Sequence, residues 1–529
     1  MAIREFSSGS ERRGIVCVGR GPATDLEKRA FTDRGYKLVD MPASSLTDTK
    51  AIGVLDSVIF SQRATNPTRV AKELEQYASK LLDSDCRVYV RVATSDVLRG
   101  YGREMVVNAI RRLDLPAAGL SPAEREAVTS DQREREGLPL APYVYVCDVG
   151  HTWQHVAQLI SDNPAGKPPR LDLFIDARDS NDNEFRLTVE QELLVKRAFA
   201  DCTVVHLRQM QDGLSGVLVF RAHAELAGGL EGRWPILFFV KLGSRRKIGI
   251  EYAKYQEHAL LYVPFNLGPR LNLDRCGLGS HEAIIVGDFV EQAEALKDSA
   301  SAGRAAQAIG NLFSRTLRAW HNAARQDYDR SVFESLSYLF PAMIPPIREP
   351  LIRAYGATLT LDQARALFGR RKSKPVLVGT IHGDLNATNV LVRVGDAIVI
   401  DFEQLREGMP LVYDCACVEA GLLVDGFADD KREMSIWLQS IEPLYANRNV
   451  YEWLTPCHPK DPSAWFYDCV RQIRLHARQF ELAEDQYATA LALAFIKKAC
   501  NPHNFGDRRD ELRAMGFLIA ERILNLIAT

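Results

Sequence analysis

Three polar residues in one stretch of the sequence, Asp384, Asn389 and Asp401, are spaced so that they could serve a phosphoryl transfer. The stretch runs from Val378 to Leu405 and reads VGTIHGDLNATNVLVRVGDAIVIDFEQL. A loop between two structured elements can point Asp384 at a nucleophile, while Asn389 turns toward a metal ion on nucleotide phosphates. A hairpin then brings Asp401 back to the same metal. Phosphoryl transfer requires mainly positioning, charge neutralisation and one oriented carboxylate, which this set would supply.

An upstream strand supplies a lysine of the kind that holds nucleotide phosphates. The segment Ile236–Gly243 reads ILFFVKLG, an apolar strand whose one charged residue is Lys241. A lysine at a strand end commonly extends into solvent instead, but its position before the catalytic stretch favours the phosphate-binding role. Further upstream, QDGLSGVLVF predicts a turn with glycines at 213 and 216 before a strand. The turn lacks a full G-x-G-x-x-G pattern and by itself fits any hairpin.

The segments H-G-D-x-x-x-x-N and I-D-F-E resemble the catalytic and metal-binding loops of the aminoglycoside phosphotransferase and choline kinase group, relatives of the protein kinases. They are especially similar to phosphotransferase-like domains of bacterial signalling and conflict systems. The resemblance covers about residues 188 to 529 and is strongest over 378 to 415. It implies ATP as the phosphate donor, Asp384 as the catalytic base, and Asn389 and Asp401 as ligands of Mg²⁺. A turn rich in Asp and Asn that caps a hairpin is the alternative interpretation.

The same resemblance implies that Lys241, Ser215 and Gly216 contact the nucleotide, and that an acid on the following helix pairs with the lysine. The segment KIGIEYAKYQEHALLYVP offers Glu251 and Glu257 for this pairing. These two residues are six apart and lie on different helical faces. The E-x-x-x-Y spacing after the first of them favours Glu251, and the choice between the two stays open.

Two further residues, His382 and Asp414, are expected to support the catalytic loop. Asp414, in LVYDCACVEA, resembles an aspartate that braces this loop through backbone hydrogen bonds, although a helix N-cap accounts for it equally well. The resemblance places acceptor specificity in the large helical lobe and in insertions such as residues 326 to 375. We find neither a strongly acidic cluster suited to aminoglycosides nor a clear choline box.

The N-terminal part of the chain predicts a doubly wound α/β domain. From residue 14 onward, short β-branched runs alternate with amphipathic stretches, as in a βαβ series on a mostly parallel sheet. The layout resembles a response-regulator receiver, but Ser61 and Gln62 stand where the phosphate-accepting aspartate would be, so we expect no phosphoacceptor role. Two later runs, starting at Tyr143 and Leu171, either extend this sheet or form a small separate unit.

A polar stretch, Asp176 to Phe185, predicts a linker and a domain boundary near residue 180. Thr188 and Gln191 then have the spacing of a capping box, which predicts the start of a helix. The sequence thus predicts a multidomain chain with an α+β bilobal protein-kinase-like fold after the α/β domain. The expected domains are a receiver-like domain over 1–180, a strand-rich kinase-like lobe over 188–290 and a helical lobe with the catalytic loop over 291–529.

Composition narrows the class of protein. The chain has 529 residues, which allows two to four domains, and is 46% hydrophobic and 25% charged, as ordinary soluble proteins are. A formal net charge of −2 gives no support to a nucleic-acid partner. We find no apolar run of the ~18 residues that a membrane span needs and no secretory signal at the start. We therefore expect a cytoplasmic, bacterial protein whose ten cysteines are reduced.

The sequence predicts an ATP- and Mg²⁺-dependent phosphotransferase that moves the γ-phosphate to a hydroxyl group of a small molecule or a protein. A nucleotide-binding scaffold in a signalling or defence system is one alternative, and a nucleotidyltransferase with the same fold is another. By analogy with receiver folds, the N-terminal domain is a candidate for dimerisation or for binding a protein partner.

Overall fold

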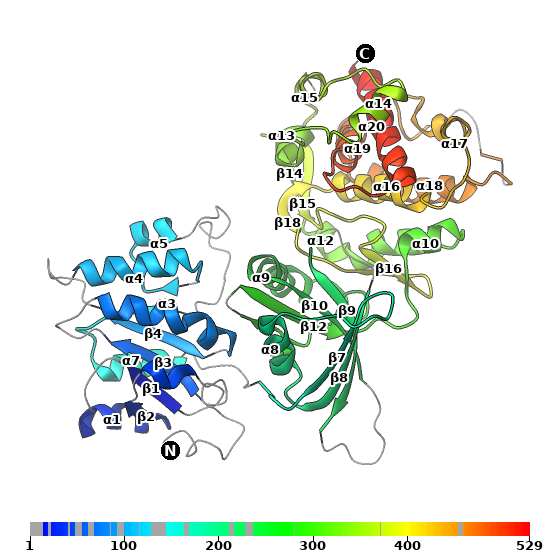
Figure 1. Ribbon diagram of the computed structural model, residues 1–529. Coiled ribbons are helices and arrows are strands. Elements are labelled where there is room, and N and C mark those ends of the chain that lie inside the picture. Colours follow the sequence, from blue (N-terminus) through cyan, green and yellow to red (C-terminus); the bar gives the residue numbers. More distant parts are fainter. Residues whose placement is uncertain are drawn as a thin grey trace. The chain divides into compact units, whose positions relative to one another are not determined.

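The computed structural model describes residues 14–18, 23–40, 43–47, 55–61, 68–84, 86–92, 100–115, 117–128, 144–162, 169–210, 216–227, 236–279, 281–370, 372–452, 457–458 and 460–528. The chain divides into two compact units. The first comprises residues 1–253 and 270–289, and the second comprises 254–269 and 290–529. Figure 1 shows their helices and strands.

The N-terminal part of the first unit is a parallel six-stranded sheet, as the βαβ pattern predicts. The strand order is β2-β1-β3-β4-β6-β5, and its first four positions follow the doubly wound order in which the switch point lies between β1 and β3. The strands are β1 (Gly14–Val18), β2 (Lys37–Asp40), β3 (Leu55–Ser61), β4 (Arg87–Val92), β5 (Ala117–Ala118) and β6 (Val144–Asp148). The helices are α1 (Asp25–Thr32), α3 (Thr68–Asp83), α4 (Gly100–Arg112), α5 (Pro122–Val128) and α7 (Trp153–Asp162).

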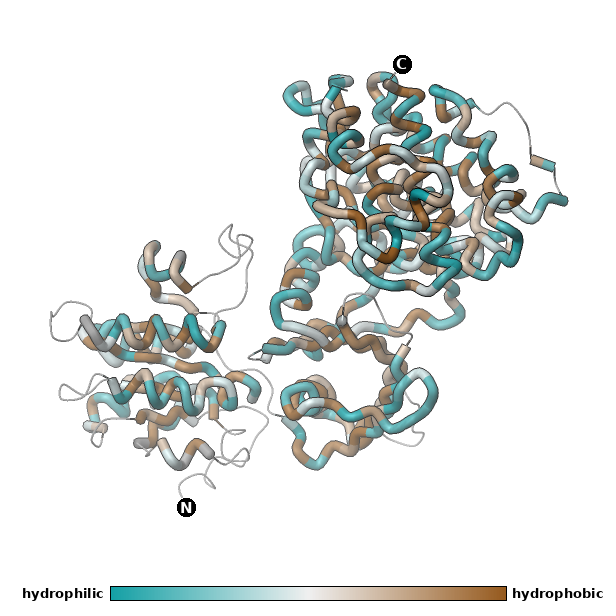
Figure 2. The backbone as a smooth tube through the Cα atoms, turned by 45° about the horizontal axis from the view of Figure 1, so that its top comes forward, coloured by the Kyte–Doolittle hydropathy of each residue, from teal (hydrophilic) through white to brown (hydrophobic). Residues whose placement is uncertain are grey.

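Both faces of this sheet are buried under helices. Because successive side chains of a strand point to opposite sides, the residues of each strand divide between two cores. In β1, Ile15 and Cys17 pack with α1 and α7, whereas Val16 and Val18 pack with α3 and α4. Figure 2 shows hydrophobic and hydrophilic residues alternating along these helices, which is the pattern of helices with one apolar face. Ser61 ends β3, while Gln62 lies outside the described residues.

A second sheet of the first unit is mixed, with the order β11-β12-β10-β9-β8-β7. Only β7 and β8 pair in parallel among its described strands. Its elements are β7 (Phe174–Arg178), α8 (Val189–Ala198), β8 (Cys202–Gln209), β9 (Leu218–Leu226), β10 (Ile236–Ser244), α9 (Arg245–Lys254), β11 (Gly277–Leu278) and β12 (Glu282–Asp288). Helix α8 packs on one face of this sheet, and Ile248 of α9 contacts residues on the other.

The structure assigns the two runs whose sheet the sequence left open. The run at Tyr143 becomes β6 of the parallel sheet, whereas the run at Leu171 becomes β7 of the mixed sheet. The mixed sheet therefore begins before the boundary placed near residue 180. The predicted linker over 176–185 is not a plain connection, because it contains the end of β7 and a bridge between Arg178 and Glu184. The capping box at Thr188 is confirmed.

The second unit is mainly helical, with two three-stranded sheets ordered β13-β16-β17 and β14-β15-β18. Its strands are β13 (Glu294–Ala295), β14 (Arg325–Asp327), β15 (Val376–Ile381), β16 (Val390–Arg393), β17 (Asp396–Val399) and β18 (Arg406–Pro410). Its helices are α10 (Leu296–Ser301), α11 (Ala306–Asn311), α12 (Arg318–Asn322), α13 (Val332–Leu336), α14 (Glu349–Ala354), α15 (Leu361–Arg370), α16 (Val412–Gly426), α17 (Met434–Ile441), α18 (Ala464–Phe480), α19 (Gln486–Ala499) and α20 (Asp507–Ala528).

A buried polar network joins three helices of the second unit. Arg474 of α18 forms a bidentate ion pair with Glu419 of α16, at 2.7 and 3.0 Å, and Tyr487 of α19 donates to the same carboxylate at 2.7 Å. A buried pair of this kind must be fully satisfied to be tolerated, so it fixes how these helices align. Every helix among the described residues is too short or too polar to span a bilayer. All ten cysteines are free thiols.

Candidate active site

The loop that carries Asp384 connects β15 to β16 and is held by a carboxylate from another element. Asp414, in the first turn of α16, accepts hydrogen bonds from the backbone amides of His382, at 2.8 Å, and Gly383, at 3.0 Å. Asp414 is buried, and burial raises its pKa, while its bonds to the loop and the neighbouring His382 oppose that rise. The helix N-cap is Leu411, so Asp414 braces the loop and does not cap the helix.

The backbone at Gly383 explains why a glycine stands before the aspartate. Its φ is +77°, a left-handed conformation, and a Cβ there would lie 2.3 Å from the carbonyl oxygen of Gln404. Only a residue without a side chain fits both conditions. The adjacent His382 is fully buried, and its Nε2 donates to the carbonyl oxygen of Ile400 at 3.0 Å. His382 thus ties the loop to the strand end that precedes Asp401.

Asp384 lies in a dense set of hydrogen-bond donors. The side-chain amide of Asn386 donates to Asp384 Oδ2 at 3.1 Å. The side-chain amide of Asn389 donates to the carbonyl oxygen of Asp384 at 2.9 Å and to Oδ2 at 3.3 Å. The structure therefore brings Asp384 and Asn389 together, and these bonds fix the direction of the carboxylate.

Lys497, near the end of α19, is a site residue that the sequence reasoning missed. Its Nζ lies 3.2 Å from Asp384 Oδ1 and 3.4 Å from the carbonyl oxygen of Gly383. Burial alone would raise the pKa of Asp384, but the charges of Lys497 and Lys498 outweigh it and hold that pKa below its ordinary value. In return, Asp384 outweighs burial and raises the pKa of Lys497. The carboxylate is therefore kept ionised at neutral pH.

The hairpin formed by β16 and β17 links Asn389 to Asp401. The backbone amide of Ile400 donates to the carbonyl oxygen of Asn389 at 3.0 Å, so the residues at the two open ends lie side by side. Asp401 follows directly and has a φ of +69°, an uncommon conformation for any residue but glycine. Conformations of this kind cost free energy and persist only where the surrounding structure enforces them. They concentrate at functional sites.

These two residues fit Mg²⁺ by the chemistry of their donors. The amide oxygen of Asn389 and the carboxylate of Asp401 are hard oxygen ligands, and Mg²⁺ binds proteins through one or two such groups together with phosphate oxygens and water. No cluster of three or more His, Cys, Asp or Glu residues suited to a metal occurs in the described part of the chain. Asn389 and Asp401 thus suit a metal ion that binds together with a nucleotide better than one held by protein ligands alone.

In the first unit, Lys241 and Glu251 form a close ion pair. Lys241 Nζ lies 2.8 and 3.0 Å from the two carboxylate oxygens of Glu251, and both side chains are largely buried. Lys241 is opposite Ile285 in the β10–β12 ladder, on the sheet face that contacts α9. Glu257, the other candidate, is half-exposed in a π-helical turn and lies 3.6 Å from His258. The structure thus pairs the strand lysine with Glu251.

The predicted phosphate loop is only partly described. Gly216 has a φ of +70°, in the turn that leads into β9, and a Cβ there would meet no other heavy atom within 4 Å. Ser215 lies outside the described residues.

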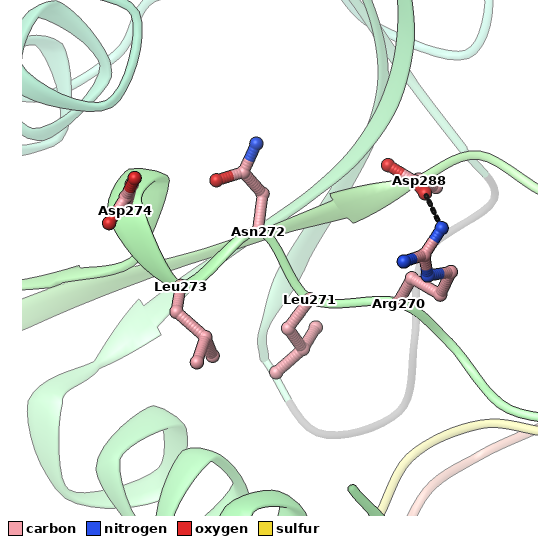
Figure 3. A pocket seen from close by; sticks show the side chains of 6 residues that line it. All are labelled: Arg270, Leu271, Asn272, Leu273, Asp274 and Asp288. Carbon is pink, nitrogen blue, oxygen red and sulfur yellow. Dashed lines mark ion pairs between the residues drawn. The ribbon is translucent and has the colours of Figure 1, made fainter. Parts of the chain in front are cut away.

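A shallow hollow of about 360 Å³ lies beside the end of β12 (Figure 3). Its lining residues are Arg270, Leu271, Asn272, Leu273, Asp274 and Asp288, with Arg270 3.9 Å from Asp288. None of the predicted site residues lines this hollow.

Comparison with known proteins gives one family match. Residues 359–497 match the family described as Ternary complex associated domain 9. The matched stretch includes the loop that carries Asp384, together with Asp414 and Lys497, and covers about a quarter of the chain. No curated protein matches the chain.

Several solved kinase structures are similar to the chain at low identity. Amicoumacin kinase hAmiN in complex with AMP-PNP, Ca²⁺ and Ami is 12% identical over 60% of this chain and 87% of its own, with a TM-score of 0.33. An aminoglycoside-3'-phosphotransferase of type VIII is 17% identical over 55% and 93%, with a TM-score of 0.30. Choline kinase from Cryptosporidium parvum Iowa II is 10% identical over 61% and 90%, with a TM-score of 0.32.

Proposed function

We propose that this protein is an ATP- and Mg²⁺-dependent phosphotransferase that moves the γ-phosphate to a hydroxyl group. The observation that carries this proposal is the arrangement around Asp384. Its carboxylate is ionised, its loop is braced by Asp414, and its partner Asn389 is joined to Asp401 by a hairpin. A carboxylate fixed beside oxygen ligands for a metal is the constellation that phosphoryl transfer needs.

Each residue receives a role from its own surroundings. Asp384 orients the acceptor hydroxyl and takes its proton as the hydroxyl oxygen bonds to the γ-phosphorus of ATP and the bond from that phosphorus to ADP breaks. Asn389 and Asp401 would hold Mg²⁺, which neutralises phosphate charge when bound. Lys241, oriented by Glu251, contacts the phosphates of ATP, and the turn at Ser215 and Gly216 covers them.

The domain built on the N-terminal sheet would mediate dimerisation or bind a protein partner. Its third strand ends in Ser61, so it carries no phosphoacceptor aspartate there. The family match, whose description refers to a ternary complex, supports a protein that works within an assembly. Ten free thiols suit the reducing cytoplasm of a bacterium, where ATP is also abundant.

The test is transfer of labelled phosphate by the full chain. The protein is incubated with γ-labelled or α-labelled ATP, Mg²⁺ and cell extract, and the labelled products are separated. We expect the γ-label to move, and Asp384→Asn to abolish transfer while AMP-PNP binding persists. Asp298→Asn, an exposed acid of the same unit, is the matched control and should transfer as the wild type does.

Three outcomes would contradict this proposal. Unchanged transfer by Asp384→Asn would remove the catalytic assignment. Movement of the α-label would indicate a nucleotidyltransferase. AMP-PNP binding by the wild type without any transfer would indicate a nucleotide-binding scaffold.

A further inference from the structure

The carboxylate of Asp384 has positive charge beside it. Lys497 contacts Asp384 Oδ1, and the two side chains remain 31% and 37% exposed, so a ligand can reach both. An acceptor hydroxyl that approaches this carboxylate therefore meets the ammonium group of Lys497 as well. The question is whether a second group of the acceptor finds a partner nearby.

Arg406 provides a second cation beside the same loop. It is the first residue of β18 and stands opposite Ile381, the residue before His382, in the antiparallel pairing of β15 and β18. Its guanidinium lies 4.0 Å from the ring centroid of Tyr338. Tyr338 belongs to the segment 326–375, which the family resemblance identifies as an insertion.

Arg406 and Lys497 both lie close enough to Tyr338 for their charges to affect its hydroxyl group. Burial raises the pKa of the Tyr338 hydroxyl, and the positive charges of Arg406 and Lys497 both oppose that rise. The Tyr338 ring is nonetheless 43% exposed. Both cations therefore lie within electrostatic range of one accessible side chain.

Arg406 has no acidic partner in the described part of the chain. Its ring contact with Tyr338 leaves the edge of the guanidinium, where its N–H donors lie, for another ligand. The next residue, Glu407, points to the opposite face of the strand and lies 3.4 Å from His258. An arginine that stacks on an aromatic ring without a carboxylate is suited to bidentate binding of a phosphate group.

We propose that the acceptor is an anion, a hydroxyl compound that also carries a phosphate group, and that Arg406 binds this group with Lys497 beside it. This proposal rests on the proposed function, because it concerns the acceptor of the proposed phosphate transfer. The site should therefore disfavour acceptors that carry an amine, since Arg406 and Lys497 would repel a cation.

The experiment measures binding of inorganic phosphate, with acetate as a monoanion for comparison. The full chain is saturated with AMP-PNP and Mg²⁺, and each anion is titrated calorimetrically. We expect phosphate to bind more tightly than acetate, and Arg406→Gln to weaken phosphate binding about tenfold or more. Arg406→Lys keeps the charge but loses the planar guanidinium. Its phosphate affinity should lie between those of Arg406→Gln and the wild type, which would show that the loss in Arg406→Gln does not come from misfolding.

Arg365→Gln is the matched control, because Arg365 also stacks on an aromatic ring of the same unit, 4.5 Å from the Phe340 centroid. It should bind phosphate as the wild type does. Equal phosphate affinity in Arg406→Gln and the wild type, tighter binding of acetate than of phosphate, or phosphate binding that occurs only when AMP-PNP is omitted would each overturn the proposal. If AMP-PNP itself does not bind, the proposed function fails. The phosphate titration of the wild type and Arg406→Gln is then repeated without nucleotide, which tests the role of Arg406 separately.

Discussion

Asp414 shows how much of the geometry of the loop that carries Asp384 depends on a single side chain. Its two carboxylate oxygens each accept one amide of the loop, from His382 and Gly383, in a fully buried setting. Such charge-assisted bonds are about twice as strong as neutral ones. The position of Asp384 is therefore set by a residue of a different element, and the loop itself does not need to be stiff.

His321 gives a prediction about pH at the same scale. It is largely buried beside Phe313 and Phe480, and its Nδ1 donates to the carbonyl oxygen of Phe313 at 3.2 Å. Burial, aided by nearby His476, outweighs that bond and lowers the pKa of His321 to about 4. The unfolded chain takes up this proton near pH 6.5, whereas the folded chain does not. The stabilisation is therefore complete above pH 6.5 and is lost as the pH falls toward 4.

We expect His321 to contribute up to about 3 kcal/mol to the difference in unfolding free energy between pH 7 and pH 4.5. The measurement is urea unfolding at several pH values for the wild type and for His321→Phe, which keeps the ring. The variant should lose less stability on acidification. Parallel pH profiles for the two proteins would contradict this assignment.

At the scale of elements, the β16–β17 hairpin carries Asn389 and Asp401 at its open end and Val394 at its turn. Arg393 pairs with Asp396, so the turn has two residues, Val394 and Gly395, with φ values of +51° and +80°. Two positive values are the signature of a type I′ turn, which favours Asn-Gly. A β-branched valine is strained there, and Val394 is 97% exposed, so packing does not compensate.

We expect Val394→Asn to stabilise the protein by about 1 kcal/mol, because asparagine tolerates the left-handed conformation. Chemical unfolding measures the change, and phosphate transfer should be unaffected because the turn lies away from the open end of the hairpin. Gly395→Ala is the opposing control and should destabilise the protein. No gain in stability from Val394→Asn would show that the turn relaxes the valine in another way.

At the scale of the whole molecule, the proposed function gives each unit a separate task toward the nucleotide. Lys241 with Glu251 belongs to the first unit, and Asn389 with Asp401 belongs to the second. Phosphate binding and metal binding should therefore fail independently when single residues are changed.

We expect removal of Mg²⁺ to weaken AMP-PNP binding by about tenfold or more, which is ~1.4 kcal/mol. Asp401→Asn should bind as weakly with Mg²⁺ as the wild type does without it. Lys241→Ala should lose affinity by a similar factor in both conditions, because its contact does not involve the metal. Calorimetric titration measures all three. A persistent Mg²⁺ dependence in Asp401→Asn would show that another residue holds the metal.

The sequence alone predicted features that depend on neighbouring residues. The loop that carries Asp384, the hairpin and Asp401 lie within 17 positions of Asp384, so their order follows from turn and strand patterns along one segment. The capping box at Thr188 and the strand that contains Lys241 are local in the same sense. The alternation of apolar runs likewise predicted the parallel sheet, since period and length decide between strand and helix.

Tertiary structure decided what depends on contacts between distant residues. The run at Leu171 has the same pattern as any buried strand, and only its pairing with β8 places it in the mixed sheet. Lys497 looks like an ordinary basic residue in the last turn of a helix, yet it contacts Asp384 across 113 positions. Arg406 likewise stacks on Tyr338 only once α13 and β18 have packed. Local sequence patterns specify which helices and strands form. Which side chains from distant parts of the chain become neighbours depends on how these elements pack, and the local periodicity of the sequence does not encode that packing.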